Sequence, residues 1–113
     1  MAKKREHLTT VLEAISQPVR REILKQLRNG EKPAASLAAR FQVSFPAVSQ
    51  HLAILKHAGL VSERRAGRQR IYQLRAKPLK EVYDWIGAYE QFWSNKLDQL
   101  GKFLRNKHGQ DRT

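Results

Sequence analysis

The side chains of this chain that are best suited to recognise a ligand lie between Ser44 and Arg70, and most of them are small, polar or basic. If the residues around Val48 form a helix, the positions opposite Val48 share one face, at 100° per residue. That face carries Pro46, Ser49, Gln50, Ala53 and His57, with Ala47 and Lys56 at its flanks. An amide such as that of Gln50 can pair bidentately with adenine, and small side chains can meet a thymine methyl group. The face is therefore suited to base edges in a major groove; the alternative is a helix face that only meets water.

Four arginines follow this face, at the tip of a predicted β-hairpin. The hairpin has strands over Leu60–Arg65 and Arg70–Leu74 and a turn at Ala66-Gly67-Arg68-Gln69, in which Gly67 supplies the positive φ of a tight turn. The four are Arg64, Arg65, Arg68 and Arg70. Like charges this close repel one another unless a polyanion lies nearby. They indicate contacts to phosphates or to a narrow minor groove.

The segment from Pro33 to Val61 contains the elements that would position these groups. It is predicted to form two short helices, with a turn at Gln42-Val43-Ser44 between them and apolar residues on their inner faces. These apolar residues are Leu37 and Phe41 in the first helix and Val48, Leu52 and Leu55 in the second. Gly59 ends the second helix, and Leu60 is the hydrophobic residue that usually accompanies a left-handed cap. The spacing predicts a helix-turn-helix, and the basic hairpin after it completes a winged helix.

Two further helices are predicted before this motif. The first spans about Leu8 to Ile15. Pro18 opens the second at the first helical position, where its missing N–H costs nothing, and Asn29-Gly30 stops it. The inner face of the second helix carries Ile23, Leu24 and Leu27.

Pro78 opens a long last helix that we expect to run to about Asn106, about 43 Å at 1.5 Å per residue. An apolar stripe recurs along it at steps of three and four residues: Leu79, Val82, Ile86, Tyr89, Trp93, Leu97, Leu100 and Leu104. Trp85 and Phe92 add a second apolar flank. Because a monomer would expose this surface, we expect the same helix of a second subunit to cover the stripe. The alternative is a stripe that folds back onto its own domain.

Positive charge is concentrated in the predicted winged helix. The chain has 113 residues, enough for one modest domain, and a net charge of +12. Residues 1–77 contain 16 Lys and Arg against 5 Asp and Glu, and so hold 11 of the 12 charges. This is the footprint expected for a nucleic-acid partner. A membrane partner is disfavoured, because no segment is apolar for 18 residues.

The chain ends carry no targeting signal that we recognise. The N-terminal sequence MAKKREHLTT lacks the apolar region of a signal peptide, so we expect the chain in the cytoplasm. We interpret residues 1–7 and 107–113 as flexible ends. The alternative for Lys3, Lys4 and Arg5 is an arm that seeks phosphates.

Residues for other kinds of chemistry are missing. The chain has no cysteine, which excludes disulfides, thiolate metal sites and cysteine nucleophiles. His51 and His57 are six residues apart, about 240° around a helix, and cannot share a metal ion. His51 borders the core face, where we expect packing and a phosphate contact; the alternative is a proton switch. There is no glycine-rich phosphate loop, and no nucleophile has a base beside it in sequence, so we expect neither an enzyme nor a cofactor.

Three segments together resemble the ArsR family of bacterial winged-helix repressors, over about residues 8–106. They are ISQPVRREIL at 15–24, SFPAVSQHLAILKHAGLV at 44–61 and RRAGRQRIYQL at 64–74. The first is similar to the family's L-S-D-P-T-R-R-x-I-L stretch, with Gln17 in place of the usual aspartate, a change that weakens the cap of the second helix. The second resembles the family's recognition helix, with its Ser-x-His-Leu core at Ser49, His51 and Leu52.

The resemblance also bears on metals. The segment DWIGAYEQFWSNKLDQLGKFL at 84–104 resembles a branch of the family that does not depend on metals. The cysteine pair of the family's helix-three metal sites would fall near PAASLAAR at 33–40, which has no metal-binding side chain, and the last helix has no histidine before His108.

We therefore expect a mainly α fold with a small β-hairpin wing: a winged helix-turn-helix over 8–77 and a dimerisation helix over 78–106, in one domain. The expected function is a homodimeric, sequence-specific repressor that binds a pseudo-palindromic operator in double-stranded DNA and is not a metal sensor. The expected DNA contacts are Ser44, Pro46, Ala47, Ser49, Gln50, His51, Lys56, Arg65, Arg68 and Gln69.

Three alternatives stay open beside this expectation. The winged helix could bind nucleic acid without sequence preference, or the aromatic last helix could serve a protein-interaction module. A small apolar effector could lodge among the aromatic rings of the last helix, at Trp85, Tyr89, Phe92 and Trp93.

Overall fold

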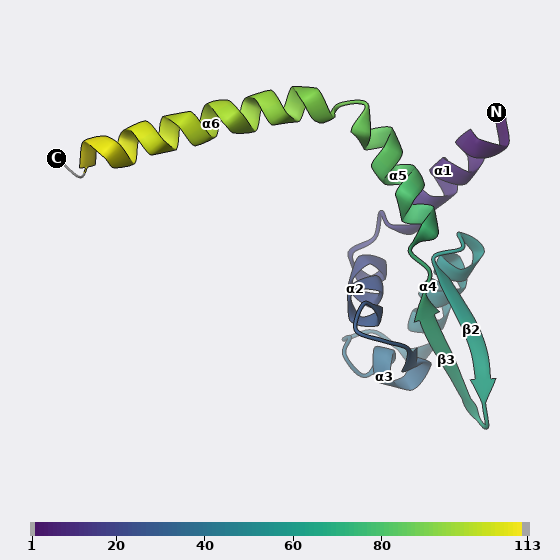
Figure 1. Ribbon diagram of the computed structural model, residues 1–113. Helices are drawn as coiled ribbons and strands as arrows, with labels where there is room; N and C mark the ends of the chain where they lie inside the picture. The colour runs from purple at the N-terminus through teal and green to yellow at the C-terminus, as the bar shows by residue number, and fades with distance from the viewer. Residues whose placement is uncertain (1, 112–113) are drawn as a thin grey trace. The chain divides into compact units, whose positions relative to one another are not determined.

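The structure of this chain, a computed structural model, describes residues 2–111, with the side chains of residues 6–106. Contacts divide the chain into two compact units, one up to Val82 and one from Tyr83 onward. The elements in chain order are α1 (Ala2–Ala14), α2 (Pro18–Leu27), β1 (Lys32–Pro33), α3 (Ala34–Ala38), α4 (Phe45–His57), β2 (Val61–Ala66), β3 (Gln69–Leu74), α5 (Lys77–Gly87) and α6 (Glu90–Asp111) (Figure 1). The predictions made for the side chains of Lys3, Lys4 and Arg5 and for 107–113 lie outside the described side chains.

The first unit is a winged helix-turn-helix, so the predicted fold class is confirmed. Its sheet has three antiparallel strands in the order β1-β3-β2. The β2–β3 hairpin pairs Val61 with Leu74 and Ala66 with Gln69, which leaves a turn at Gly67-Arg68 with Gly67 at φ +65°. The strand β1 was not predicted, because two residues that end in a proline carry no alternation signal.

The core of this unit is built from the apolar faces that periodicity predicted. Val48, Leu52 and Leu55 of α4 are at most 1% exposed. They pack with buried residues of the other elements, among them Val11, Ile23, Leu24, Leu27, Leu37, Leu60, Val61 and Tyr72. The helix α3 is shorter than predicted, since it ends at Ala38, and Phe41 packs against the core from the turn that follows.

The helix ends show where sequence signals were strong and where they were weak. Gln17 precedes α2 without a side-chain hydrogen bond, as expected for a residue that replaces a better cap, and Pro18 stands at the start of the helix. The helix α1 begins at Ala2, whereas Leu8 was predicted. Good helix formers occupy the intervening positions and no cap or breaker interrupts them.

The predicted single helix over 78–106 is wrong, because two helices, α5 and α6, occupy this region. The backbone N–H of Ala88 bonds to the carbonyl of Trp85 at 3.4 Å, and that of Tyr89 to the carbonyl of Ile86 at 2.8 Å. These bonds to the third residue back tighten the chain after Gly87, a poor helix former. The apolar stripe is therefore carried on two helices.

Leu79 and Val82 were predicted to lie in the dimer surface, but in the structure they pack within the first unit. Val82 is 8% exposed and belongs to the core of the first unit, and Leu79 packs against the same core. Nδ1 of His7 on α1 also lies 3.0 Å from each carboxylate oxygen of Glu81. The first turns of α5 are thus used within their own unit. No helix in the described part of the chain is long and apolar enough to cross a bilayer.

Candidate nucleic-acid interface

The first turn of α4 is held by its own sequence. Ser44 caps the helix: its Oγ accepts a hydrogen bond from the N–H of Ala47 at 3.2 Å, and its carbonyl accepts one from Val48 at 3.1 Å. Pro46 lies in the first turn, where its fixed φ suits a helix. Ser44, predicted to contact DNA, therefore first serves to fix the start of the helix.

The last turn of α4 is fixed equally well. The N–H of Leu60 bonds to the carbonyl of Leu55 at 2.9 Å, and that of Gly59, at φ +78°, bonds to the carbonyl of Lys56 at 3.0 Å. This is a Schellman motif, which confirms the predicted glycine stop. Between the two caps, the face opposite the core presents exposed Pro46, Gln50, Ala53 and His57, with Ala47 and Ser49 half-buried.

A groove of about 360 Å³ joins α4 to the wing and brings four of the predicted site residues together. The four are Ser49, Arg65, Arg68 and Gln69. Arg70 adds a third cation, and the remaining lining is mostly apolar: Pro33, Ala34, Ala35, Phe45 and Tyr72. The groove thus has a basic rim on the wing beside the start of α4, as a sugar-phosphate strand requires.

The arginines of the wing differ in how they are held. Nε of Arg64 donates to a carboxylate oxygen of Glu31 at 3.3 Å, and its Nη2 donates to the other oxygen. This bidentate bond lowers the pKa of Glu31 and raises that of Arg64. Arg65 and Arg68 are exposed and lie at the groove. Of the basic cluster predicted at the tip, Arg64 is therefore the member that forms a bidentate bond with a carboxylate.

Lys56 is tied to the wing through Glu63 of β2. Its Nζ donates to one carboxylate oxygen of Glu63 at 3.2 Å, and the hydroxyl of Tyr72 donates to the other at 2.6 Å. The bond from Tyr72, and then Lys56, lowers the pKa of Glu63, whereas burial and then Glu63 raise the pKa of Tyr72 to about 12. Lys56, which was predicted to contact DNA, has a carboxylate partner in the structure and remains exposed.

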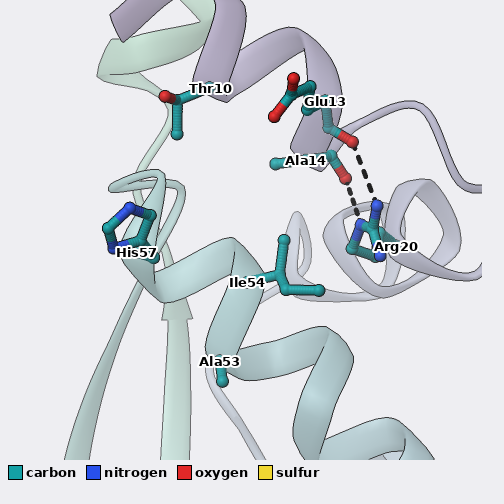
Figure 2. A pocket seen from close by; sticks show the side chains of 7 residues that line it. All are labelled: Thr10, Glu13, Ala14, Arg20, Ala53, Ile54 and His57. Atoms are coloured by element: carbon teal, nitrogen blue, oxygen red, sulfur yellow. Dashed lines mark hydrogen bonds between the residues drawn. The ribbon is translucent and has the colours of Figure 1, made fainter.

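His51 lies on the side of α4 that faces α2, half-buried, where it meets Arg20. Arg20 is 8% exposed, and its Nη1 donates to Nδ1 of His51 at 3.1 Å. Its Nε and Nη2 donate to the carbonyls of Ala14 at 2.6 Å and Glu13 at 3.1 Å, at the end of α1 (Figure 2). Burial, and then the charge of Arg20, lower the pKa of His51.

Sequence reasoning missed Arg20, although one signal could have found it. It stands three and four residues before Ile23 and Leu24, so it lies in the apolar stripe of α2. A charged residue within such a stripe needs polar partners when it is buried. The end of α1 supplies them here.

A second hollow, of about 410 Å³, lies where α1, α2 and α4 meet (Figure 2). It is lined by Thr10, Glu13, Ala14, Arg20, Ala53, Ile54 and His57. Although Glu13 and His57 are both present, the described residues contain no group of three His, Cys, Asp or Glu side chains that could hold a metal ion.

In the second unit, the predicted stripe is exposed along its length. Its members, Ile86, Tyr89, Trp93, Leu97, Leu100 and Leu104, are between 44% and 64% exposed, and Trp85, Phe92 and Phe103 are exposed beside them. The rings of Trp85 and Tyr89 pack edge to face at 6.3 Å, as do those of Phe92 and Trp93 at 5.7 Å. This is a large apolar surface for a chain on its own.

Comparison with known proteins gives consistent matches. The family model described as bacterial regulatory protein, arsR family, matches residues 17–63. The chain is 38% identical to the transcriptional repressor SdpR of Bacillus subtilis (strain 168) over 79 residues, 70% of this chain and 88% of that protein. It is 39% identical to the HTH-type transcriptional regulator Rv2034 of Mycobacterium tuberculosis over 92 residues, 81% of this chain and 83% of that protein.

Solved structures agree with these matches. A crystal structure of an ArsR family transcriptional regulator superposes with a TM-score of 0.74 at 26% identity and covers 80% of this chain and 93% of its own. The homodimeric winged helix-turn-helix DNA-binding domain Mb0332 from Mycobacterium bovis, described as a possible ArsR-family transcriptional regulator, gives a TM-score of 0.65 at 25% identity. It covers 80% of this chain and 86% of its own.

Proposed function

Because the chain belongs to the ArsR family of bacterial regulatory proteins, we propose that it is a homodimeric repressor that reads a pseudo-palindromic operator in double-stranded DNA. Membership makes it a DNA-binding transcriptional regulator and not an enzyme. The observation that carries the finer proposal is the groove that joins α4 to the exposed arginines of the wing.

In this proposal α4 enters the major groove and the wing holds the backbone beside it. Gln50 is exposed on the outer face of α4, where its amide can pair with adenine. Arg65 and Arg68 contact phosphates, which position the protein without reading sequence. Arg64 contributes less, because Glu31 already offsets its charge.

The proposed two-fold symmetry of the dimer and its operator rests on one α4 per chain and on an exposed apolar stripe. Two copies that bury Tyr89, Trp93, Leu97 and their neighbours against each other would present two copies of α4. The half-sites would then lie about one helical turn apart, about 34 Å. The homodimeric state of the similar Mb0332 domain supports this assembly.

Selection of bound sequences from random duplex DNA, together with light scattering, tests the proposal. We expect a two-fold symmetric site with half-site centres about 10 base pairs apart, and a dimer at micromolar concentration. A monomer bound to a site without symmetry would contradict the proposal. Competition against random duplex DNA at two salt concentrations separates sequence-specific from non-specific binding.

The proposal includes independence from metal ions. The chain supplies no thiolate for soft metals, and Leu79–Asn106 contains no histidine for a zinc site on the last helices. Addition of Zn²⁺, Cd²⁺ or arsenite should therefore leave operator affinity unchanged. Release of operator DNA at micromolar metal, reversed by a chelator, would refute this part. If an effector exists, we propose a small apolar ligand at the rings of Trp85, Tyr89, Phe92 and Trp93.

A further inference from the structure

We propose that Phe45, at the start of α4, determines specificity by contacting the methyl group of a thymine in each half-site. This inference rests on the proposed function, since it assumes that α4 lies in a major groove. Phe45 is not among the expected DNA contacts, because those were chosen as small, polar or basic side chains.

The first argument is that Phe45 does not serve the core. Its side chain is 52% exposed, whereas Tyr72 is 5% exposed and Phe41 packs against the core. These three are the aromatic residues between 6 and 82, the part of the first unit with described side chains. Among these three residues, Phe45 is therefore the one whose ring is not packed in the core.

The second argument is that the backbone on either side of Phe45 is held in place. Ser44 before it is the N-cap, bonded to the N–H of Ala47, and Pro46 after it has a fixed φ. Residues at the N-terminal end of a helix-turn-helix recognition helix are those that reach base edges. The backbone that carries Phe45 is thus fixed before DNA binds, which lowers the entropy lost on binding.

The third argument is the charge beside the ring. Phe45 lines the groove together with Ser49, one turn further along α4, and with the wing residues Arg65, Arg68 and Arg70. These cations direct the sugar-phosphate strand over the groove. The major-groove edges of the bases on that strand then lie over Phe45.

The chemistry of the ring then selects the base. Stacking covers the faces of bases in a duplex, so an aromatic side chain that enters the major groove meets their edges. The thymine methyl group is the apolar feature among these edges. It is attached to C5, on the side of the base nearest its own backbone, which is the strand that the wing arginines hold.

The experiment removes the thymine methyl group and the ring of Phe45 separately. The probe is the duplex that the wild-type protein selects from random DNA, with each thymine replaced in turn by deoxyuridine, which lacks only the methyl group. We expect one thymine per half-site at which this replacement weakens wild-type binding about fourfold, the effect of burying one methyl-sized group. Phe45→Ala removes the ring from both half-sites, so it should bind the original duplex about as weakly as the wild type binds a duplex with deoxyuridine at that thymine in both half-sites. The variant should lose nothing further when that thymine is replaced.

Two variants complete the design. Phe45→Leu keeps an apolar side chain and should keep part of the methyl effect. Tyr83→Ala removes another exposed ring, 70% exposed and on α5, and should keep the whole effect. Because Phe45 is exposed, thermal melting of all three variants should match the wild type.

The outcomes separate this inference from the proposed function. If the wild type selects no sequence, the proposed function fails. Two results would overturn only the role of Phe45 if the wild type does select a sequence. In the first, binding by Phe45→Ala still weakens when the methyl group is lost; in the second, Phe45→Ala loses as much affinity for random duplex DNA as for the selected duplex. Tighter binding of single-stranded DNA than of the duplex by the wild type, lost in Phe45→Ala, would show stacking on unpaired bases and would also overturn it.

Discussion

Arg20 donates a hydrogen bond from Nη1 to Nδ1 of His51 over 3.1 Å, which joins a buried cation on α2 to the helix α4. Because a guanidinium can only donate, Nδ1 of His51 must accept, and a neutral His51 therefore carries its proton on Nε2. The same guanidinium holds the carbonyls of Glu13 and Ala14 at the end of α1. One side chain thus links three helices of the first unit.

Arg20→Met should lower the free energy of unfolding by about 2–4 kcal/mol, because it leaves three buried or half-buried acceptors without their charged donor. Urea denaturation at neutral pH measures this loss. Arg20→Lys should recover little of it, since one ammonium cannot reproduce the fork of a guanidinium. Arg21→Met is the control: Arg21 is exposed and its Nη1 donates to the carbonyl of Ile15 at 2.8 Å, so the variant removes a bond that water can replace. Equal stability of the Met variants at 20 and 21 would contradict the prediction.

The pH dependence of stability should report on His51. Its pKa in the folded protein is lowered by burial and then by Arg20, so between the folded and unfolded pKa values the unfolded state binds more protons. Stability from this site is therefore full above about pH 6.5 and is lost as the pH falls below it. His51→Asn keeps an acceptor on the same carbon but does not titrate. Urea denaturation from about pH 7.5 to 5.5 should show the wild type losing stability relative to this variant; parallel curves would refute the prediction.

Local signals predicted much of this fold, because each acts within a few residues. The stripe of Val48, Leu52 and Leu55 and the stop at Gly59 are both set by spacings of three or four residues. In contrast, Arg20 and His51 are 31 residues apart, and no periodicity pairs them.

The candidate site shows the same division. Sequence patterns placed Gln50 on the outer face of α4 and Arg68 at the hairpin tip, since both follow from helix or strand geometry. They could not show that Glu31 pairs with Arg64, 33 residues away, or that Glu63 holds Lys56. A charge pattern along the chain shows where basic residues gather, but the acidic residues that pair with them are set by tertiary contacts.

Glu63→Gln should increase non-specific DNA binding by releasing Lys56. The amide keeps an oxygen for the hydroxyl of Tyr72 but no longer offsets the ammonium 3.2 Å away. If Lys56 then reaches a phosphate, the plot of log affinity against log salt steepens by about 0.9 for each new contact. Glu22→Gln, at an exposed site on α2, changes the net charge equally and is the control. The same slope for both variants would show that Lys56 stays in place.

Gln50→Ala and Arg68→Ala should separate reading of bases from holding of the backbone. Loss of a bidentate amide contact weakens operator binding by about 1–3 kcal/mol per half-site and leaves random DNA unaffected. Arg68→Ala should weaken both duplexes alike and flatten the salt dependence. Arg64→Ala, which removes an arginine paired with Glu31, should flatten it less. If Arg68 instead sets sequence preference, the wing reads DNA shape and Gln50 loses its proposed role.

Trp93→Ala should weaken the proposed dimer more than it changes the isolated chain, because Trp93 is 56% exposed in one chain and is expected to be buried by the second. Truncation of a well-packed tryptophan costs about 3–5 kcal/mol, so dissociation should become visible by light scattering at concentrations where the wild type stays dimeric. Since association then contributes to stability by mass action, the melting temperature of the variant should depend more steeply on concentration. Asn95→Ala, about 200° around the helix from Trp93, is the control and should leave both properties unchanged. If Trp93→Ala stays dimeric with unaltered melting, Trp93 lies outside the interface, and the two copies must associate through a face of α6 that does not include Trp93.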